Sequence, residues 1–401
     1  MVGLAPCCRA CGGADLRSLL TVDRVPAVVG ALWPTAAQAR DAITGRLEMV
    51  ICYSCSHISN VAFDRSLVDY DPGYENSLHF SPTFRQYADE LAERLVERYD
   101  VRGKTVLEIG SGKGEFLQLL CAKGSNQGVG YDPTYAGESD TEGVTFVRAL
   151  YPLDGTGDAF DVLACRHVLE HLAEPYELLA GLRKSCVNAD ARLYFEVPNG
   201  EFTMSASGQW DLIYPHVSYF TEASLCRLLR RSGFEVLQCG TAFDGQFLYA
   251  EVAPSDVCND DGDHNQIKAS VVHAEAFAAT YWSTIAEWRH RLVPAPRLAD
   301  ERDPDAGGSA DDGAGAALWG AGAKGTTFLN ALGRDSRVVA VVDVNPRKWG
   351  RFVPGTGHQV AAPAALRDHV IGTVIITNST YRREISEELA VLGITADVVC
   401  V

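Results

Sequence analysis

Four cysteines near the start of the chain have the type and spacing of metal ligands. Cys8 and Cys11 form one CxxC pair, and Cys52 and Cys55 form a second. Each pair can place two thiolates on one metal, and four thiolates complete a tetrahedral zinc shell. That shell leaves no position for water, so we predict a structural zinc site. Because the interval between the pairs exceeds the usual ribbon spacing, four unrelated reduced cysteines are the alternative.

A glycine-rich turn follows a short apolar run in the sequence VLEIGSGKGEF, residues 106–116. Gly110, Gly112 and Gly114 would let the backbone approach a ligand at the start of a helix. Asp132 follows about twenty residues later, at the end of a second apolar run, where a carboxylate can hold ribose hydroxyls. The set resembles class I S-adenosylmethionine (SAM)-dependent methyltransferases. In that family the residues equivalent to Glu108 and the glycines line the methionine portion, and the equivalent of Asp132 binds the ribose. An NAD-binding unit is the alternative, but the first loop lacks GxGxxG spacing.

A second glycine loop, WGAGAKGTTFLN, has the GxGxxG spacing of a dinucleotide fingerprint. Its glycines are Gly320, Gly322 and Gly325, and Asp343 follows at the end of the next apolar run. Spacing alone would make the chain a dehydrogenase fused to a methyltransferase.

Three histidines are candidates for proton transfer. His216 stands among aromatic and apolar residues in WDLIYPHVSYF, and either a packed core histidine or a base in an apolar pocket fits that setting. His167 and His171, in RHVLEHL, are four residues apart and are predicted to share one helical face. Capping or core packing is the alternative for both.

The elements that must position these residues follow from the apolar pattern. Short apolar runs alternate with helical stretches from about residue 104 to 253, which predicts a mainly parallel α/β sheet, and a second such pattern begins near residue 318. A helical period over FRQYADELAERLVERYD precedes the first sheet. We predict a zinc-binding domain (1–66), a methyltransferase domain (67–255), a helix with a flexible acidic linker (256–317) and a C-terminal Rossmann-like domain (318–401).

Composition excludes several classes of partner. The 401 residues carry a formal net charge of −17, which argues against nucleic acids and anionic membranes as partners. The sequence contains neither a signal peptide nor a long apolar span, so we expect a cytoplasmic protein with reduced thiols. Cys7 and His57 lie close to the CxxC pairs, but a closed four-cysteine site needs neither.

The ordered combination of motifs resembles the sugar C-methyltransferases of antibiotic biosynthesis over nearly the whole chain. It runs from CRACG through YENSLHFSPTF, VLEIGSGKGEF, HVLEHL, EVPNG and IYPHVSYF to GAGAKG and DVNPRKWGRFVPGTGH. The resemblance implies a zinc-binding domain, a SAM-binding domain and a C-terminal Rossmann-like domain that closes over a nucleotide sugar, so the second glycine loop would face a diphosphate and not a redox cofactor.

The resemblance also implies a chemistry for the histidines. Carbon methylation needs a base that removes a proton beside a ketone and leaves an enolate. Tyr214 and His216 match the family pattern, with His216 as the base, but Pro215 stands where the family usually has Glu. His171 is predicted to contact the substrate, and Tyr74 and Glu75 are predicted to reach the site. The prediction is C-methylation of a dTDP-linked keto-deoxysugar. The alternatives are methylation of another small metabolite and a non-catalytic SAM-binding protein.

Overall fold

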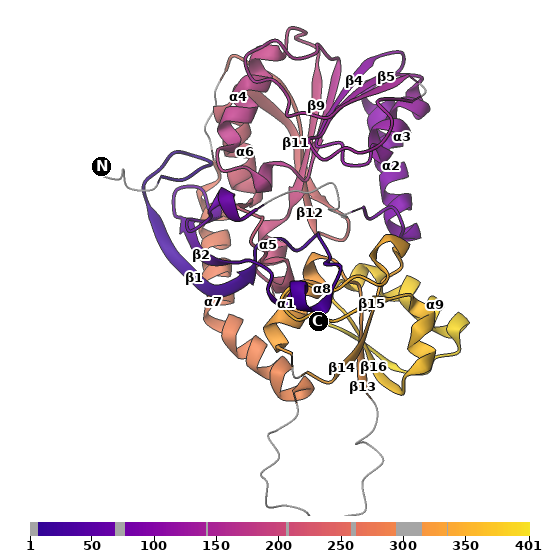
Figure 1. The fold of residues 1–401 in the computed structure, drawn as a ribbon. Coiled ribbons are helices and arrows are strands. Elements are labelled where there is room, and N and C mark those ends of the chain that lie inside the picture. Colours follow the sequence, from indigo (N-terminus) through magenta and orange to yellow (C-terminus); the bar gives the residue numbers. More distant parts are fainter. Residues whose placement is uncertain are drawn as a thin grey trace, which may run out of the picture.

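The computed structural model describes residues 7–68, 77–141, 143–205, 208–257, 262–293, 315–334 and 336–401. Figure 1 shows two α/β units, one above the other, with the N-terminal segment beside both. Tyr74 and Glu75 lie outside the described residues. Among the helices of the described ranges, none combines the length and the apolar character needed to cross a bilayer.

The N-terminal unit is a small antiparallel sheet with strand order β1-β2-β3-β10. Its elements are β1 (Leu16–Pro26), α1 (Ala36–Arg40), β2 (Thr44–Cys52) and β3 (Ile58–Asn60). The last strand, β10 (Ser218–Tyr219), comes from the middle of the chain and pairs with β3. The sheet therefore extends beyond the predicted 1–66 boundary, because a buried segment of the central unit completes its edge.

The central unit is a mainly parallel sheet with strand order β11-β12-β9-β8-β4-β5-β7-β6. Strands β7, β5, β4, β8 and β9 run parallel, and the hairpin β11–β12 joins antiparallel at one edge. The strands are β4 (Thr105–Ile109), β5 (Gln127–Tyr131), β6 (Asp140–Thr141), β7 (Val144–Val147), β8 (Val162–Arg166), β9 (Arg192–Pro198), β11 (Phe234–Ala242) and β12 (Phe247–Pro254). The helices are α2 (Pro82–Tyr99), α3 (Glu115–Gly124), α4 (Pro175–Ser185), α5 (Gly200–Thr203) and α6 (Glu222–Arg231), with 3₁₀ turns η2 (Leu169–His171) and η3 (Gln209–Asp211).

The predicted apolar runs and helical period correspond to elements of this unit. The helix predicted from FRQYADELAERLVERYD is α2, which begins at an N-cap formed by Ser81 and buries Leu91 and Leu95. The predicted runs TVLEIG, FDVLAC and RLYFEVPN form the central strands β4, β8 and β9. These strands are buried along almost their whole length, as expected for parallel strands covered on both faces.

Helix α7 (His264–Leu292) connects the central unit to the last one. It begins at an N-cap formed by Asp263 and buries one stripe that includes Val271, Phe277 and Ile285. In Figure 1 it runs beside the N-terminal sheet and ends beside the C-terminal unit. The predicted acidic linker lies mostly outside the described residues.

The C-terminal unit is a parallel sheet with strand order β15-β14-β13-β16-β17. Its elements are β13 (Gly315–Trp319), α8 (Ala323–Leu332), β14 (Val338–Val342), β15 (Val360–Ala361), β16 (Ile371–Ile376), α9 (Arg382–Leu392) and β17 (Asp397–Cys400). Strand β13 begins at Gly315, ahead of the predicted boundary at residue 318, because its pairing with β16 already starts there.

Candidate active site and cysteine cluster

The four cysteines of the two CxxC pairs come together in a knuckle at the end of the N-terminal sheet. The Sγ atoms of Cys8 and Cys55 are 3.5 Å apart, and those of Cys11 and Cys52 are 3.6 Å apart. All four sulfurs lie within 4.8 Å of one another. Tetrahedral zinc with Zn–S bonds of about 2.3 Å separates its sulfurs by about 3.8 Å. The donor set and its spacing therefore fit one metal ion.

The knuckle is attached to the central unit through α6. The guanidinium groups of Arg227 and Arg231 donate to the carbonyls of Ser54 and Ala10, at 2.6 and 3.2 Å. His57 is buried against Phe220, with its ring 4.9 Å from the phenyl ring, and burial lowers the pKa of His57 to about 3. The knuckle thus holds the segment that precedes α6, and His57 packs beside it as an apolar ring.

The first glycine loop leaves β4 and enters α3 with all three glycines at positive φ. A Cβ on Gly110 would lie 2.2 Å from Val168, and one on Gly114 would lie 2.3 Å from Phe146. A Cβ on Gly112 would meet nothing within 4 Å, so its face of the loop is open. Gly110 and Gly114 have no room for a side chain because neighbouring residues pack against them. Gly112 leaves room for a ligand to approach the backbone closely.

Asp132 and Glu108 flank this loop. Asp132 Oδ2 accepts from the Gly112 N–H at 2.9 Å, and Asp132 Oδ1 accepts from both donors of Thr134. Glu108 is buried, and one of its oxygens has no hydrogen-bond partner in the described part of the chain. Burial raises the pKa of Glu108 to about 8, against the opposing charge of Arg166. The loop is thus flanked by an oriented carboxylate and by a buried carboxyl with one oxygen left without a partner, and both fit a polar ligand.

The segment after β8 is not the continuous helix predicted from RHVLEHL. His167 has a left-handed φ of 55°, and only the short turn η2 follows it, so His167 and His171 do not share one helical face. The His167 N–H donates to the Glu196 carbonyl at 2.8 Å, and its ring nitrogens lie 3.6 Å from Glu170 and 3.2 Å from Glu196. The Glu196 carbonyl thus holds the His167 backbone, and the two carboxylates hold its ring.

Two of the histidines are held neutral and one is held charged. Burial alone would lower the pKa of His167, but Glu170 and Glu196 outweigh it and raise that pKa to about 9. Burial lowers the pKa values of His171 and His216 to about 4. His167 is therefore a paired cation at neutral pH, whereas the other two imidazoles are free bases.

His216 and His171 face each other, with ring centroids 4.9 Å apart. Side-chain atoms of both lie within 4.8 Å of a Glu170 oxygen. His171 Nδ1 is 3.0 Å from the Pro215 carbonyl oxygen, while His216 Nδ1 is buried without a hydrogen-bond partner in the described ranges. Because a Cβ on Gly110 would meet Val168, the residue directly before η2, this cluster adjoins the first glycine loop.

Tyr214 is turned toward the N-terminal sheet. Its hydroxyl accepts from the Asp64 N–H at 2.7 Å, and its ring centroid is 5.4 Å from that of Phe63. A Cβ on Gly45 would lie only 2.1 Å from the Tyr214 ring. These contacts fix the Tyr214 side chain against the N-terminal sheet.

Sequence reasoning missed four charged residues around this cluster. Glu196, at the end of β9, accepts from Arg166 Nε at 3.0 Å and from Tyr194 at 2.8 Å, and also from Tyr87. Burial opposes its ionisation, but Arg166 and His167 hold the pKa of Glu196 well below its usual range. The other three are Glu170, Asp211 and Lys324. The only sequence signals of these three are their places inside HVLEHL, inside WDLIYPH and inside the second glycine loop.

The carboxylate beside the second glycine loop, Asp343, has a cationic partner that Asp132 of the first loop lacks in the described residues. Asp343 Oδ2 accepts from the Ala321 N–H at 2.8 Å and from Lys348 Nζ at 2.9 Å, and its Oδ1 accepts from the Asn345 N–H. In the described residues no such cation pairs with Asp132 of the first loop. The groups that could hold ribose hydroxyls at the second loop are therefore engaged internally.

Comparisons with known proteins agree with this architecture. A methyltransferase domain matches residues 80–239, and a C-methyltransferase C-terminal domain matches residues 308–396. The chain is 26% identical over 400 residues to the C-methyltransferase NovU of Streptomyces niveus, covering 94% of this chain and 90% of the relative. It is 29% identical over 169 residues to a tRNA U34 carboxymethyltransferase of Dichelobacter nodosus, covering 39% of this chain and 54% of that protein.

A solved structure, the 1,6-didemethyltoxoflavin-N1-methyltransferase of Burkholderia thailandensis, is 18% identical. The match covers 44% of this chain and 82% of that one, with a TM-score of 0.34. That likeness is too weak to bear on function.

The α/β fold and the two matching domain families define the chain as a SAM-dependent methyltransferase. Within that class it is similar to the C-methyltransferase NovU over most of its length. The chain itself combines a four-cysteine cluster, a methyltransferase domain and a C-methyltransferase C-terminal domain.

We predict that the second glycine loop binds neither NAD(P)(H) nor a second SAM. Lys348 and the loop itself occupy the Asp343 carboxylate, so a ribose would have to displace a buried ion pair. Calorimetry should give one SAM per chain and no heat on adding NADH or NADPH. A stoichiometry of two, or dinucleotide binding in the micromolar range, would contradict this prediction.

Proposed function

We propose that the protein is a SAM-dependent C-methyltransferase of a keto-deoxysugar carried on a nucleoside diphosphate such as dTDP, in antibiotic biosynthesis. The observation that carries the proposal is the neutral, buried His216, which faces His171 in the turn η2 after β8. Strand β8 lies next to β4, from which the first glycine loop leaves. The similarity to NovU and the C-methyltransferase C-terminal domain support carbon as the methylated atom.

In the proposed mechanism His216 acts as the general base. It removes a proton from the carbon beside the ketone, and the electron pair of that C–H bond forms an enolate. SAM supplies an electrophilic methyl group when bound. The nucleophilic carbon would bond to this methyl group as the methyl–sulfur bond breaks, with the electron pair of that bond left on the sulfur. The proton stays on the imidazole until it passes to solvent.

The neighbouring residues prepare His216 for this step. Burial keeps its imidazole unprotonated at neutral pH, as a base must be. The positive charge of His167 lowers the pKa of His216 further. Glu170 and Glu196 pair with His167 and so counter this charge. We propose that His171, whose Nδ1 is fixed by the Pro215 carbonyl, contacts the substrate, and that the Tyr214 hydroxyl holds the turn in place.

Replacing His216 tests the base directly. We expect His216→Asn to slow both methylation and the exchange of the substrate proton with solvent deuterium by about 10²–10⁴-fold, because general-base catalysis contributes that much. Exchange is measured by NMR with a keto-sugar nucleotide and a SAM analogue that cannot donate a methyl group. His369→Asn, at an exposed histidine of the C-terminal unit, is the control.

The acceptor panel separates the alternatives. Transfer of labelled methyl from SAM to dTDP-4-keto-6-deoxysugars is the expected result. Transfer only to other small metabolites would show that the substrate is not a keto-deoxysugar but another acceptor. If His216→Asn keeps wild-type exchange, the histidine is a core residue and the base lies elsewhere.

For the cofactor we propose that Asp132 binds the ribose and that Glu108, Gly110, Gly112 and Gly114 line the methionine portion. Asp132→Ala should weaken SAM binding by about 1–3 kcal/mol, since a charged hydrogen-bond acceptor is lost and the Gly112 N–H loses its partner. Asp154→Ala is a matched control, because Asp154 makes the same local turn with Thr156 at an exposed position. Equal SAM affinity of both variants in calorimetry would move the ribose contact elsewhere.

For the cysteine cluster we propose one structural zinc held by Cys8, Cys11, Cys52 and Cys55. Cys11→Ser should lose the metal and lower the unfolding temperature, because metal binding at such a site contributes to folding. Cys186→Ser, at a half-buried cysteine away from the cluster, should keep both. Elemental analysis that finds no zinc in wild-type protein purified without chelators would refute the site.

A further inference from the structure

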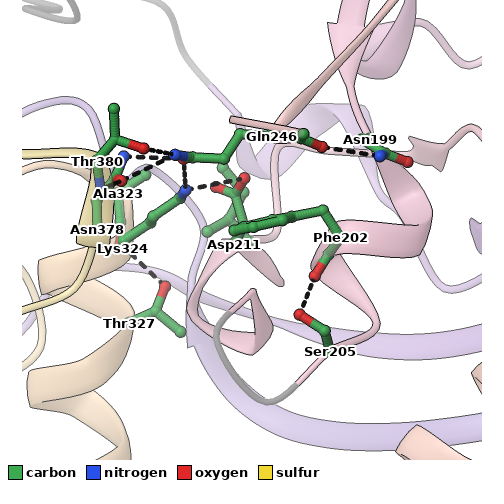
Figure 2. Close-up of polar contacts among 12 residues, drawn as sticks. Asn199, Phe202, Ser205, Asp211, Gln246, Ala323, Lys324, Thr327, Asn378 and Thr380 are labelled. Carbon is green, nitrogen blue, oxygen red and sulfur yellow. Dashed lines mark hydrogen bonds and ion pairs between the residues drawn. The ribbon is translucent and has the colours of Figure 1, made fainter. Parts of the chain in front are cut away.

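The C-terminal unit docks on the turn that leads to His216. Phe328 of α8 packs edge-on against Trp210 of η3, with ring centroids 4.8 Å apart, and Trp210 is 1% exposed. Lys324 lies one helical turn before Phe328, and Asp211 directly follows Trp210. The same apolar contact therefore brings Lys324 Nζ to 3.9 Å from Asp211 Oδ2 (Figure 2).

Lys324 is held firmly at this junction. Its Nζ donates to Gln246 Oε1 at 2.7 Å and lies 5.4 Å from the centre of the Phe202 ring. Gln246, in the β11–β12 turn, is in turn bonded to Asn378 and Thr380 of the C-terminal unit, as Figure 2 shows. The lysine side chain is 17% exposed, and burial lowers its pKa against the opposing effect of Asp211. A buried ammonium so placed requires the nearby carboxylate.

Asp211 and His216 belong to one turn. The Tyr219 hydroxyl closes it by accepting from the Ile213 N–H at 2.9 Å and lying 3.4 Å from the Asp211 carbonyl oxygen. The Tyr219 ring centroid is 5.8 Å from that of His216. Pro215, the residue next to His216, has no carboxylate, so Asp211 is the acidic group within this turn.

Charged and titratable groups on the neighbouring elements lie beside the His216 ring or act on its charge. They are Asp211 in its own turn, Tyr219 on β10, Lys324 on α8, and His167, Glu170 and His171 around η2. After burial itself, Asp211 raises the pKa of His216, whereas His167 and Lys324 lower it. The two members of the interdomain pair thus act on the imidazole with opposite signs.

We propose that Asp211 and Lys324 are positioning residues for the base. The negative charge of Asp211 favours the protonated imidazole of His216, and Lys324, which the C-terminal unit places beside Asp211, offsets part of that charge. The strength of the base therefore depends on the docking of the C-terminal unit. This inference rests on the proposed function insofar as His216 is the base. The second glycine loop, which contains Lys324, would then serve to place a charge near His216 and not to bind a dinucleotide.

The decisive experiment is an NMR titration of His216 in full-length protein with ¹³C-labelled histidine, the signal being assigned by its loss in His216→Asn. Asp211→Asn should move the titration midpoint down, and Lys324→Met should move it up, each by at least about half a pH unit. Lys324→Arg keeps the charge and should stay near wild type. Lys348→Met, which breaks an ion pair inside the C-terminal unit, is the matched control.

A change of the midpoint in the same direction for Asp211→Asn and Lys324→Met, or no change in either, would overturn the inference. Circular dichroism tests whether each variant is folded. If Lys324→Met does not fold, the midpoints of Asp211→Asn and Lys324→Arg test the inference. The titration needs no sugar. A wild-type protein that fails to exchange or methylate keto-sugars therefore refutes the proposed function, while the titration separately tests the pair.

The pH profile of exchange provides a second readout. Its acid limb should shift in the same directions as the NMR midpoints, while SAM affinity stays at the wild-type value in all four variants. Equal loss of exchange in Asp211→Asn and Lys324→Met with an unshifted acid limb would reduce the pair to a structural contact.

Discussion

The arrangement of the whole molecule depends on one buried segment, residues 209–221, at which all three units meet. Its strand β10 completes the N-terminal sheet through β3, and Phe220 bridges to Asn199 at the end of β9. Trp210 receives Phe328 from the C-terminal unit. Because His216 lies between these attachments, its position is determined by contacts from three parts of the chain that are distant in sequence.

Buried charge imposes a second constraint on the same region. Glu196 gathers Arg166, His167 and two tyrosine hydroxyls, which satisfies one carboxylate that would otherwise be costly to bury. The network keeps His167 protonated while burial keeps His171 and His216 neutral. Three histidines within fifty residues therefore take different charge states because only one of them lies between two carboxylates.

The sequence predicted those features that depend on local pattern. Continuous apolar runs indicated β4, β8 and β9, the glycine spacing indicated both loops, and the cysteine pairs indicated the four-cysteine cluster. Each of these signals comes from residues close together in the chain. The two α/β units and the long helix α7 followed from the same kind of pattern.

Other features depend on contacts that no local pattern contains. The direction of Tyr214 follows from its bond to the Asp64 backbone and from the space beside Gly45. His167 has a left-handed backbone that ends the strand in a turn, so a four-residue spacing wrongly indicated a helix. Strand β10 is too short to show a period, and the approach of Lys324 to Asp211 joins residues more than a hundred positions apart.

The shared segment also limits how such a chain can be recombined. A methyltransferase domain exchanged alone into a different setting would carry its glycine loop, Asp132 and Glu108 with it, since these are fixed within the central sheet. It would leave behind β3, Phe328 and Lys324, which hold the His216 turn from outside. The glycine loop and its two carboxyl groups would therefore stay intact in such an exchange, whereas the surroundings of His216 are kept only when all three units stay together.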